Sequence, residues 1–396
     1  MASGTAIKGG ARPQKTMGVR SRFSFFNTKA GGVDLTFLVL VLLLLAIGLV
    51  MLFSASYPNA LYYRGNSYTY IADQLVFAVA GTILMLLIST LNYRVLGASK
   101  IAWLIMLATI AMLGLVFLFP PINNAQRWIQ LYFFNIQPSE IAKFAIVILF
   151  AQMAVKNHGK MHTFRYGVLP FLPILAILGG LIIMQPHLSG TILVLSIGAI
   201  VMFIGGMGIR WLVLAVGVGV GAIAILLMIP GVLDHAMIRL EHWQDPFIDP
   251  RGAGFQTIQS MFAIGSGGLM GVGLGNSRQK FLYLPEPQND FIFSIVTEEL
   301  GFVGATLIII LFALLVWRGF VIGMRCKDRF GSLVAVGLTA QVGLQTVLNI
   351  MVVTNTIPNT GVSLPFFSYG GSSLVMLLCQ MGVVLAISRN TVMEKT

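Results

Sequence analysis

Windows of about 20 consecutive apolar residues recur along nearly the whole chain, and this pattern constrains its fold more than any other feature. Each window is long enough to cross about 30 Å of hydrocarbon as a helix. Only 10% of the residues are charged and 57% are hydrophobic, so the chain cannot cover a water-exposed surface with charge. We therefore predict an all-α polytopic membrane protein without a separate soluble domain.

The apolar windows predict about ten membrane-spanning helices. The expected domains are a basic N-terminal tail at 1–34, a single membrane domain at 35–388 and a short tail at 389–396. The apolar run after Asp34 is too long for a signal peptide and is interpreted as a retained first helix. The predicted spans are 35–54, 74–92, 101–119, 139–155, 167–185, 190–208, 211–229, 291–317, 331–355 and 371–388.

The net charge of +12 is explained better by membrane topology than by binding to nucleic acid. Most of the 25 Lys and Arg residues lie in the two tails or in alternate loops. Cytoplasmic segments carry such an excess of positive charge, so we expect both termini in the cytoplasm. The long loop at about 230–290, between helices seven and eight, is then extracellular, and its length is typical of a functional segment.

Glu140 and Lys143 place two opposite charges inside one predicted span. Each charge costs roughly 2.5–3.5 kcal/mol at the centre of a membrane helix and must be paired or face water. The i, i+3 spacing puts both side chains on one helix face, where they can neutralise each other. Either the pair orients its helix in the bundle, or it forms a polar wall for the charged head of a ligand.

Acidic residues gather near the start of the predicted span 291–317. Asp290 lies at the outer rim, and Glu298 and Glu299 follow within the span. A carboxylate at a helix N-terminus can simply cap the helix. A partly desolvated carboxylate beside other carboxylates also suits a general base. Both interpretations of Asp290 stay open at this level.

Arg127 and Trp128 lie in a short outer loop that is rich in amide side chains. A Trp in such a loop is typical of the interfacial aromatic belt. A guanidinium, an indole and several amides together would also suit a sugar that carries phosphate, since they offer bidentate charge, a flat apolar face and hydrogen-bond donors.

The glycine-rich stretch 265–275 follows no strand, so it does not predict a nucleotide-binding loop. Its glycines favour tight turns or re-entrant packing. A backbone nest for pyrophosphate is the lesser alternative.

Several short motifs follow one another along the chain. They are Arg127-Trp128, the 137–143 run, Gln185-Pro186, Trp243 to Pro250, Gly254-Phe255-Gln256, Tyr283 to Glu286, Asn289 to Phe293, Glu298 to Gly301, Pro358 to Gly361 and Leu364 to Ser373. Together they resemble the SEDS family of cell-wall proteins, whose branches are FtsW, RodA and SpoVE. The similarity runs through all ten predicted spans, and the motifs near the C-terminus are closer to the FtsW and SpoVE branches.

The resemblance implies a peptidoglycan glycosyltransferase that polymerises lipid II, an undecaprenyl-pyrophosphate-linked substrate, at the outer face of the bacterial cytoplasmic membrane. It also implies a class B penicillin-binding protein as partner, together with other divisome or elongasome proteins. Asp290 matches the family's proposed catalytic aspartate, and Trp128, Glu140 and Lys143 match positions that the family associates with activity. His187 departs from the family pattern, in which Asp commonly follows Gln-Pro.

The chemistry of these residues agrees with an inverting transfer. A single displacement needs one base and no covalent nucleophile, and Asp290 can supply the base. The pyrophosphate could be met by Arg239, Arg251, Lys280 or a divalent cation, and the sequence does not choose among them. Glu298 and Arg127 complete the expected substrate-binding set.

The competing function is a transporter that flips lipid II without catalysis, with Glu140 and Lys143 along its path. The concentration of polar residues on one face favours the enzyme, because alternating access would need polar devices on both faces. A purely structural scaffold would leave the buried charges unexplained.

Overall fold

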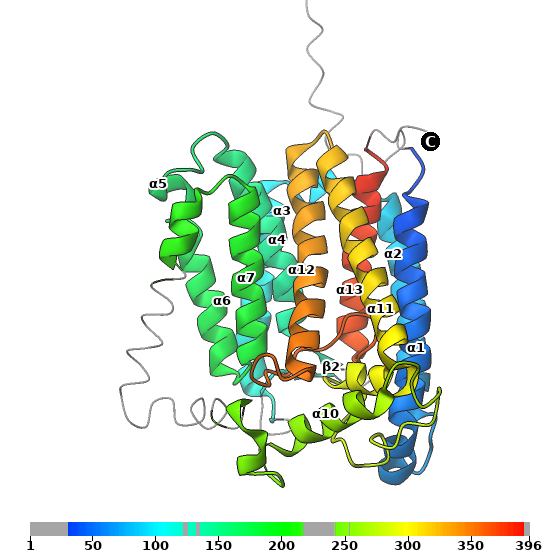
Figure 1. The fold of residues 1–396 in the computed structure, drawn as a ribbon. Helices are drawn as coiled ribbons and strands as arrows, with labels where there is room; N and C mark the ends of the chain where they lie inside the picture. The colour runs from blue at the N-terminus through cyan, green and yellow to red at the C-terminus, as the bar shows by residue number, and fades with distance from the viewer. Residues whose placement is uncertain are drawn as a thin grey trace, which may run out of the picture.

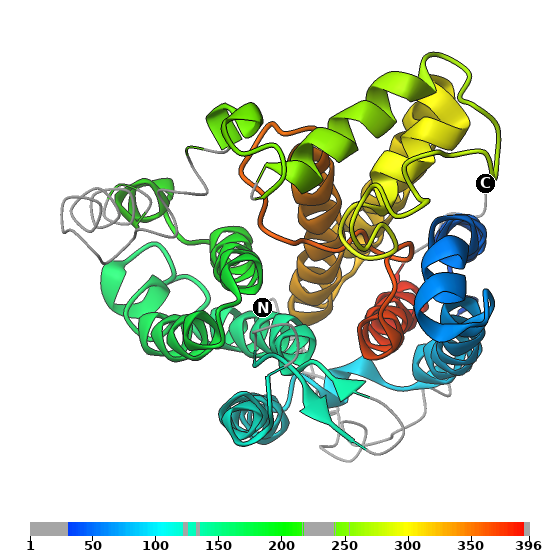
Figure 2. The same cartoon turned by 90° about the horizontal axis from the view of Figure 1, so that it is seen from below.

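The protein is a bundle of aligned helices with one short two-stranded ribbon, as the computed structural model shows (Figures 1 and 2). The structure describes residues 31–121, 126–131, 135–215, 217, 241, 243–252 and 254–391. In chain order the elements are α1 (Leu35–Arg64), α2 (Thr69–Thr90), η2 (Tyr93–Val95), α3 (Ser99–Leu115), η3 (Val116–Leu118), β1 (Ile129–Gln130), β2 (Asn135–Ile136), α4 (Pro138–Lys156), α5 (Phe164–Gly167), α6 (Leu172–Met184), α7 (Leu188–Ile204), η4 (Pro246–Ile248), α10 (Phe255–Gly267), α11 (Ile292–Arg325), α12 (Arg329–Val353) and α13 (Gly371–Ser388).

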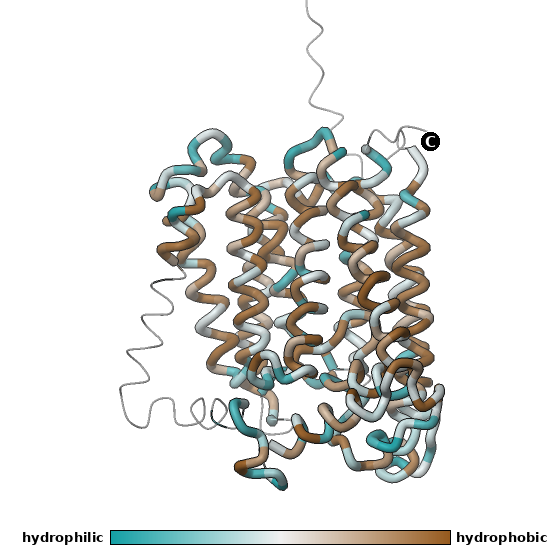
Figure 3. Tube along the Cα trace, in the orientation of Figure 1, coloured by the Kyte–Doolittle hydropathy of each residue, from teal (hydrophilic) through white to brown (hydrophobic). Residues whose placement is uncertain are grey.

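The all-α polytopic class is confirmed. Within the described residues, seven helices are long and apolar enough to cross a membrane, and α6 and α7 are shorter apolar helices. The hydrophobic stretches occupy the middle of the bundle, and polar residues gather toward its two ends (Figure 3). Every predicted span except 211–229 falls on a helix, and most of 211–229 lies outside the described residues.

The start of α1 and the end of α13 meet at one end of the bundle (Figure 1). The amide of Gly31 donates to the carbonyl of Arg389 at 3.1 Å. Asp34 caps α1 by accepting from the amide of Phe37 at 2.9 Å, and its carboxylate also pairs with Arg318 of α11 at 2.9 Å. The two ends of the described chain therefore lie on the same side, as an even number of crossings requires.

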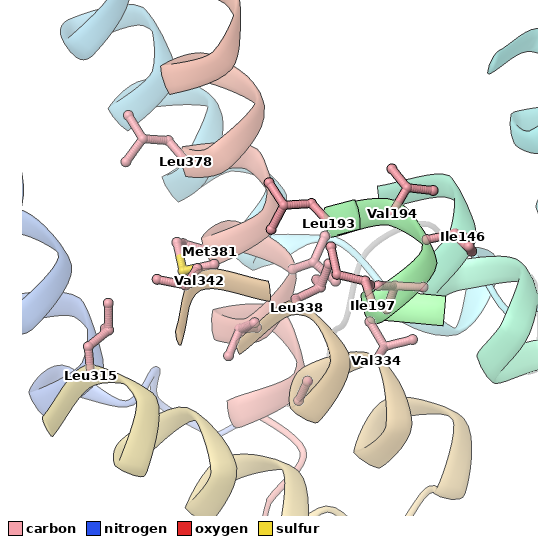
Figure 4. Close-up of a cluster of buried hydrophobic side chains, with 14 of the residues drawn as sticks. Ile146, Leu193, Val194, Ile197, Leu315, Val334, Leu338, Val342, Leu378 and Met381 are labelled. Atoms are coloured by element: carbon pink, nitrogen blue, oxygen red, sulfur yellow. The ribbon is translucent and has the colours of Figure 1, made fainter. Parts of the chain in front are cut away.

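The apolar core lies where α4, α7, α12 and α13 approach one another (Figure 4). Ile146 of α4, Val194 and Ile197 of α7, Leu338 of α12 and Met381 of α13 are all buried there. Lipid tails are as apolar as these side chains, so close van der Waals packing rather than removal from water holds the helices together. This packing fixes the helices that carry the polar residues described below.

The described part of the predicted loop 230–290 is more ordered than a long loop. Within the predicted loop 230–290, η4 and α10 are helical, and α10 lies across the end of the bundle opposite to the chain ends (Figure 1). Ser260 of α10 binds Ser294 of α11, with 2.8 Å between the two hydroxyl oxygens. α10 therefore braces the start of α11.

Helix α11 is broken at Gly301, whose φ of 68° and ψ of −172° are not helical. Such a conformation is essentially restricted to glycine. The break separates the carbonyls of Glu298 and Glu299 from their usual i+4 donors, the amides of Phe302 and Val303. Four unpaired main-chain groups would be costly inside a membrane.

A crossing segment, residues 268–273, supplies partners for all four groups. Its amides at Val272 and Gly273 donate to the two carbonyls, each at 3.0 Å. Its carbonyls at Gly268 and Leu269 accept from the two amides at 2.9 and 3.1 Å. The glycine-rich stretch thus packs across the break and completes the hydrogen bonding of the broken helix.

We expect Gly301→Ala to destabilise the protein. An added Cβ would lie 2.2 Å from the amide nitrogen of Gly271, and the backbone conformation alone costs an alanine of order 1–3 kcal/mol. The melting temperature of the detergent-solubilised protein should fall. Gly180→Ala in α6 is the matched control, because an added Cβ meets no atom within 4 Å there. Equal melting temperatures for the two variants would contradict the tight crossing at Gly301.

Candidate functional site

A cavity of about 690 Å³ lies at the α10 end of the bundle, among residues that are far apart in the sequence. Its walls come from α1, α2, α4, α7, α12 and α13, from the residues around the β-ribbon, and from the loops before α7, α11 and α13. The charged side chains that line it are Arg64, Asp73, Arg127, Glu140, Lys143, Glu286 and Asp290. Trp128 and His187 line it as well. The cavity therefore gathers Asp290 with four of the residues expected to bind substrate.

The β-ribbon places Arg127 and Trp128 at this cavity. β1 and β2 pair antiparallel, with Ile129 opposite Ile136. The ribbon returns the chain to the start of α4, so the residues before β1 lie beside that helix. The guanidinium of Arg127 donates to the carbonyl of Pro186, which connects this outer segment to the turn before α7.

Glu140 and Lys143 form an ion pair that lines the cavity. Lys143 Nζ lies 2.7 Å from Glu140 Oε2, within one turn of α4. The ammonium also donates to Gln345 Oε1 of α12 at 3.0 Å. Gln345 in turn donates to the carbonyl of Ser363 at 2.9 Å. The pair therefore both connects two helices and presents charge to the cavity, so the two sequence-based alternatives are compatible.

Asp290 is held by its main chain immediately before α11. Asn349 of α12 donates from Nδ2 to the carbonyl of Asp290 at 2.8 Å and to that of Val362 at 2.6 Å. The carboxylate rests against Gly361, where a Cβ would lie only 3.0 Å from Asp290 Oδ2. Gly361 has a φ of 70°, which suits glycine. These contacts leave the carboxylate of Asp290 directed into the cavity that it lines.

The electrostatic surroundings of Asp290 suit a proton acceptor near neutral pH. Burial and, to a smaller extent, the negative charge of Glu286 raise the pKa of Asp290 to about 6, although the charge of Arg127 opposes the increase. A base works best when its pKa lies near the operating pH. Among the described residues, no hydrogen bond joins the carboxyl group of Asp290 to the first turn of α11, so helix capping is not supported and the general base stays a prediction.

The loop that carries Asp290 is fastened to the segment before α13. The amide of Tyr369 donates to the carbonyl of Gln288 at 2.8 Å. Ser368 Oγ donates to the carbonyl of Asn289 at 2.6 Å. Asn289 also donates from Nδ2 to Glu286 at 2.6 Å, which fixes the carboxylate that acts on Asp290.

His187 precedes α7 and is buried, with 8% of its surface exposed. Burial, together with the positive charges of Arg127 and Lys143, lowers the pKa of His187 to about 3. The imidazole is therefore neutral at physiological pH and lines the cavity without adding charge.

Other residues expected at the substrate site do not line this cavity. Lys280 and Glu298 are buried outside it, where Lys280 pairs with Glu299 and Glu298 binds the backbone amide of Arg278. Arg251 is exposed and also lies outside the lining. Arg239 lies outside the described residues. Lys280 was one of the cations expected to meet the pyrophosphate, but its segment folds back against the bundle and buries it.

Polar residues on α12 were not anticipated, although the sequence carries a signal for them. Gln341, Gln345 and Asn349 are spaced by four residues within an apolar helix, so they share one face. Two of them hold the cavity wall and the main chain of Asp290. Uncharged amides inside a membrane helix indicate a polar contact, as charges do, because each amide must find a hydrogen-bond partner.

A divalent cation has limited support in the geometry. No three His, Cys, Asp or Glu side chains come together among the described residues. Glu286 and Asp290 both line the cavity, and two carboxylates alone do not define a site for a hard cation. We therefore derive no step that depends on a metal.

Comparison with known proteins gives consistent matches over nearly the full length. Residues 34–393 match the model of the FtsW, RodA and SpoVE family, described as cell cycle protein. Stage V sporulation protein E of Bacillus subtilis is 41% identical over 92% of this chain and 99% of its own length. A protein named as a probable peptidoglycan glycosyltransferase FtsW, from Geobacter sp. strain M18, is 36% identical over 90% of this chain and 97% of its own.

Solved structures have the same fold. A chain from a peptidoglycan synthase complex that coordinates polymerization and crosslinking is 29% identical, with a TM-score of 0.74, and the match covers 91% of this chain and 99% of that one. The rod shape determining protein RodA of Thermus thermophilus is 27% identical, with a TM-score of 0.66, over 91% of this chain and 98% of its own.

We expect Glu140 and Lys143 to be coupled through their charges. Glu140→Lys and Lys143→Glu should each lower the melting temperature, because each leaves like charges in contact. Exchanging the two residues should recover part of the loss. Lys156→Glu, at the exposed end of α4, is the control and should change little. Strict additivity of the two reversals in the exchanged protein would show that the charges are not paired.

Proposed function

Since this chain belongs to the FtsW/RodA/SpoVE family of cell cycle proteins, we propose that it is a peptidoglycan glycosyltransferase that polymerises lipid II into glycan strands. The observation that carries this proposal is the cavity whose lining holds Asp290 together with the cations Arg127 and Lys143. A base and an anion-binding wall are the two elements that transfer from a lipid pyrophosphate requires.

Asp290 acts as the general base in the proposed reaction. It takes the proton of the acceptor hydroxyl while that oxygen attacks the anomeric carbon of the donor sugar. The bond from this carbon to the lipid pyrophosphate breaks, and the pyrophosphate leaves with the bonding electron pair. One displacement inverts the configuration, so no covalent intermediate on the protein is needed.

The cavity wall offers the matching contacts for the donor. Arg127 can bind a phosphate through two parallel N–H groups. Glu140 and Gln345 accept from Lys143, and a third ammonium donor serves a ligand phosphate. Trp128 supplies a flat face against which a sugar can pack. Because the lipid tail stays in the bilayer, a site within membrane helices can receive the substrate from the side.

The solved relative from a synthase complex supports a proposal about partners. That complex coordinates polymerization with crosslinking. We propose that this chain works with a class B penicillin-binding protein, which would crosslink the strands made here. Other divisome or elongasome proteins would then connect the pair to cell division or cell shape.

The proposed orientation places both termini in the cytoplasm of a bacterium and the cavity at the outer face of the cytoplasmic membrane. The domain scheme of two tails around one membrane domain, 35–388, belongs to the same proposal. The distribution of Lys and Arg supports it. The cavity and α10 lie at the end of the bundle opposite to Gly31 and Arg389, which is the arrangement that this orientation needs.

We expect a cysteine at Asn276 to react with a membrane-impermeant maleimide added to intact cells, whereas one at Lys327 should not. Both positions are exposed, and they lie in segments that should face opposite sides. The background should carry Cys326→Ser and Cys379→Ser, which remove both native thiols. If only the cysteine at position 327 were labelled, the orientation would be the reverse of the one proposed. The cavity would then lie on the wrong side for extracellular synthesis.

We expect Asp290→Asn to abolish glycan synthesis by purified protein supplied with labelled lipid II and its partner. Asparagine keeps the size of the side chain but cannot accept the proton. Lipid II binding should persist. Near-normal polymer formation by the Asp290→Asn variant would show that Asp290 is not the base. If the native protein also makes no polymer, the transporter function is favoured instead.

The same assay should show a rate that rises with pH around an apparent pKa of about 6, because only ionised Asp290 accepts a proton. Glu286→Gln should move this limb to lower pH, since loss of a neighbouring negative charge favours the ionised form. A limb that stays in place in Glu286→Gln would mean that another group controls it.

A further inference from the structure

Lys280 and Glu299 form a closed ion pair outside the cavity. Both side chains have 0% exposure, and Lys280 Nζ lies 2.8 Å from Glu299 Oε1. The ammonium also donates to the carbonyl of Gly275 at 2.7 Å and to Ser54 Oγ of α1 at 3.0 Å. These three acceptors use all three donors of the lysine. Lys280 therefore has no donor left for a substrate.

Glu298, the neighbour of Glu299, fastens the same outer segment. Its carboxylate accepts from Ser277 Oγ at 2.5 Å and from the amide of Arg278 at 2.9 Å. Glu298 and Glu299 lie just before the break at Gly301, and their main-chain carbonyls are the groups that the crossing segment binds. Main chain and side chains thus fix one point of α11 from two directions.

This point lies at the far end of the short half-helix that follows Asp290. The half-helix, residues 292–300, precedes the break, and its side chains from Ile292 to Glu299 are all buried. Its length between these two residues is about 10 Å at 1.5 Å per residue. A rigid rod of this length transmits a shift at Glu299 to the loop at Asp290.

We propose that Lys280 and Glu299 are positioning residues, which hold the half-helix so that Asp290 reaches the acceptor hydroxyl. This role rests on the proposed function, in which Asp290 is the base. Small displacements matter there, because a misplacement of about 1 Å can cost about 100-fold in rate. Substrate binding depends instead on the other walls of the cavity.

Substitutions in the charge pair can distinguish a positioning role for Lys280 from a direct contact with the substrate. Lys280→Met keeps the length of the side chain and leaves Glu299 as a buried, uncompensated anion. Glu299→Gln strands the ammonium in the same way. The double variant removes both charges, and replacing a buried pair costs less than breaking it.

The test measures kcat and KM for lipid II polymerisation by the full-length protein with its penicillin-binding protein partner. Each single variant should lower kcat by about 10-fold to 100-fold with little change in KM, and the double variant should recover most of the loss. Lys327→Met, at an exposed loop, is the matched control. If Lys280→Met raises KM and the added Glu299→Gln substitution does not lower KM again, Lys280 contacts the substrate. That result would overturn the proposal.

Hydrogen exchange of backbone amides provides a readout that does not depend on activity. Lys280→Met and Glu299→Gln should raise exchange in peptides that cover 268–280 and 291–300, and the double variant should restore protection. Unchanged exchange in both single variants would overturn the proposal. Faster exchange together with a native protein that makes no polymer would reject the proposed function while retaining the anchoring of the half-helix. If Lys280→Met fails to fold, Glu299→Gln and the double variant decide both measurements.

Discussion

Inside a membrane the main chain has no water to bond with, and the rest of this structure depends on how that requirement is met. Regular helices meet it within themselves. Where α11 breaks at Gly301, residues 268–273 supply the missing donors and acceptors. Where the chain leaves helix geometry beside the cavity, Asn349 binds the carbonyls of Asp290 and Val362. Irregular backbone is therefore found where other segments supply its hydrogen-bond partners. One of these places lies beside the cavity.

Two buried lysine–glutamate pairs show how similar chemistry serves different purposes. The pair of Lys143 and Glu140 lines a cavity, and Glu140 keeps 15% of its side chain exposed. The pair of Lys280 and Glu299 is closed, with 0% exposure on both sides. An open pair can exchange partners with a ligand, whereas a closed pair with all ammonium donors engaged can only hold the structure. Burial, rather than charge or spacing, separates the two roles.

Hydropathy was sufficient to predict the membrane helices that lie in the described part of the chain, because crossing hydrocarbon demands a long apolar run. It could not predict α10, whose 13 residues are too few to span and mix apolar with polar side chains. Lys280 was expected to bind substrate because its charge could meet the pyrophosphate, and only its hydrogen bond to Ser54 of α1 reveals that it is buried. Asn349 was overlooked, although its spacing from Gln345 already predicted a polar face on that helix.

The proposed chemistry asks one cavity to hold a base and to bind an anion, and these demands interact. Arg127 favours ionised Asp290, whereas burial and Glu286 oppose ionisation and leave the pKa near 6. A bound pyrophosphate would add negative charge and raise this pKa further, as Glu286 does. Cations that face the pyrophosphate must offset that increase, or Asp290 would be protonated before it could act. In the proposed reaction the charge of Arg127 would therefore serve both tasks, since it would bind the leaving group and keep the base ionised.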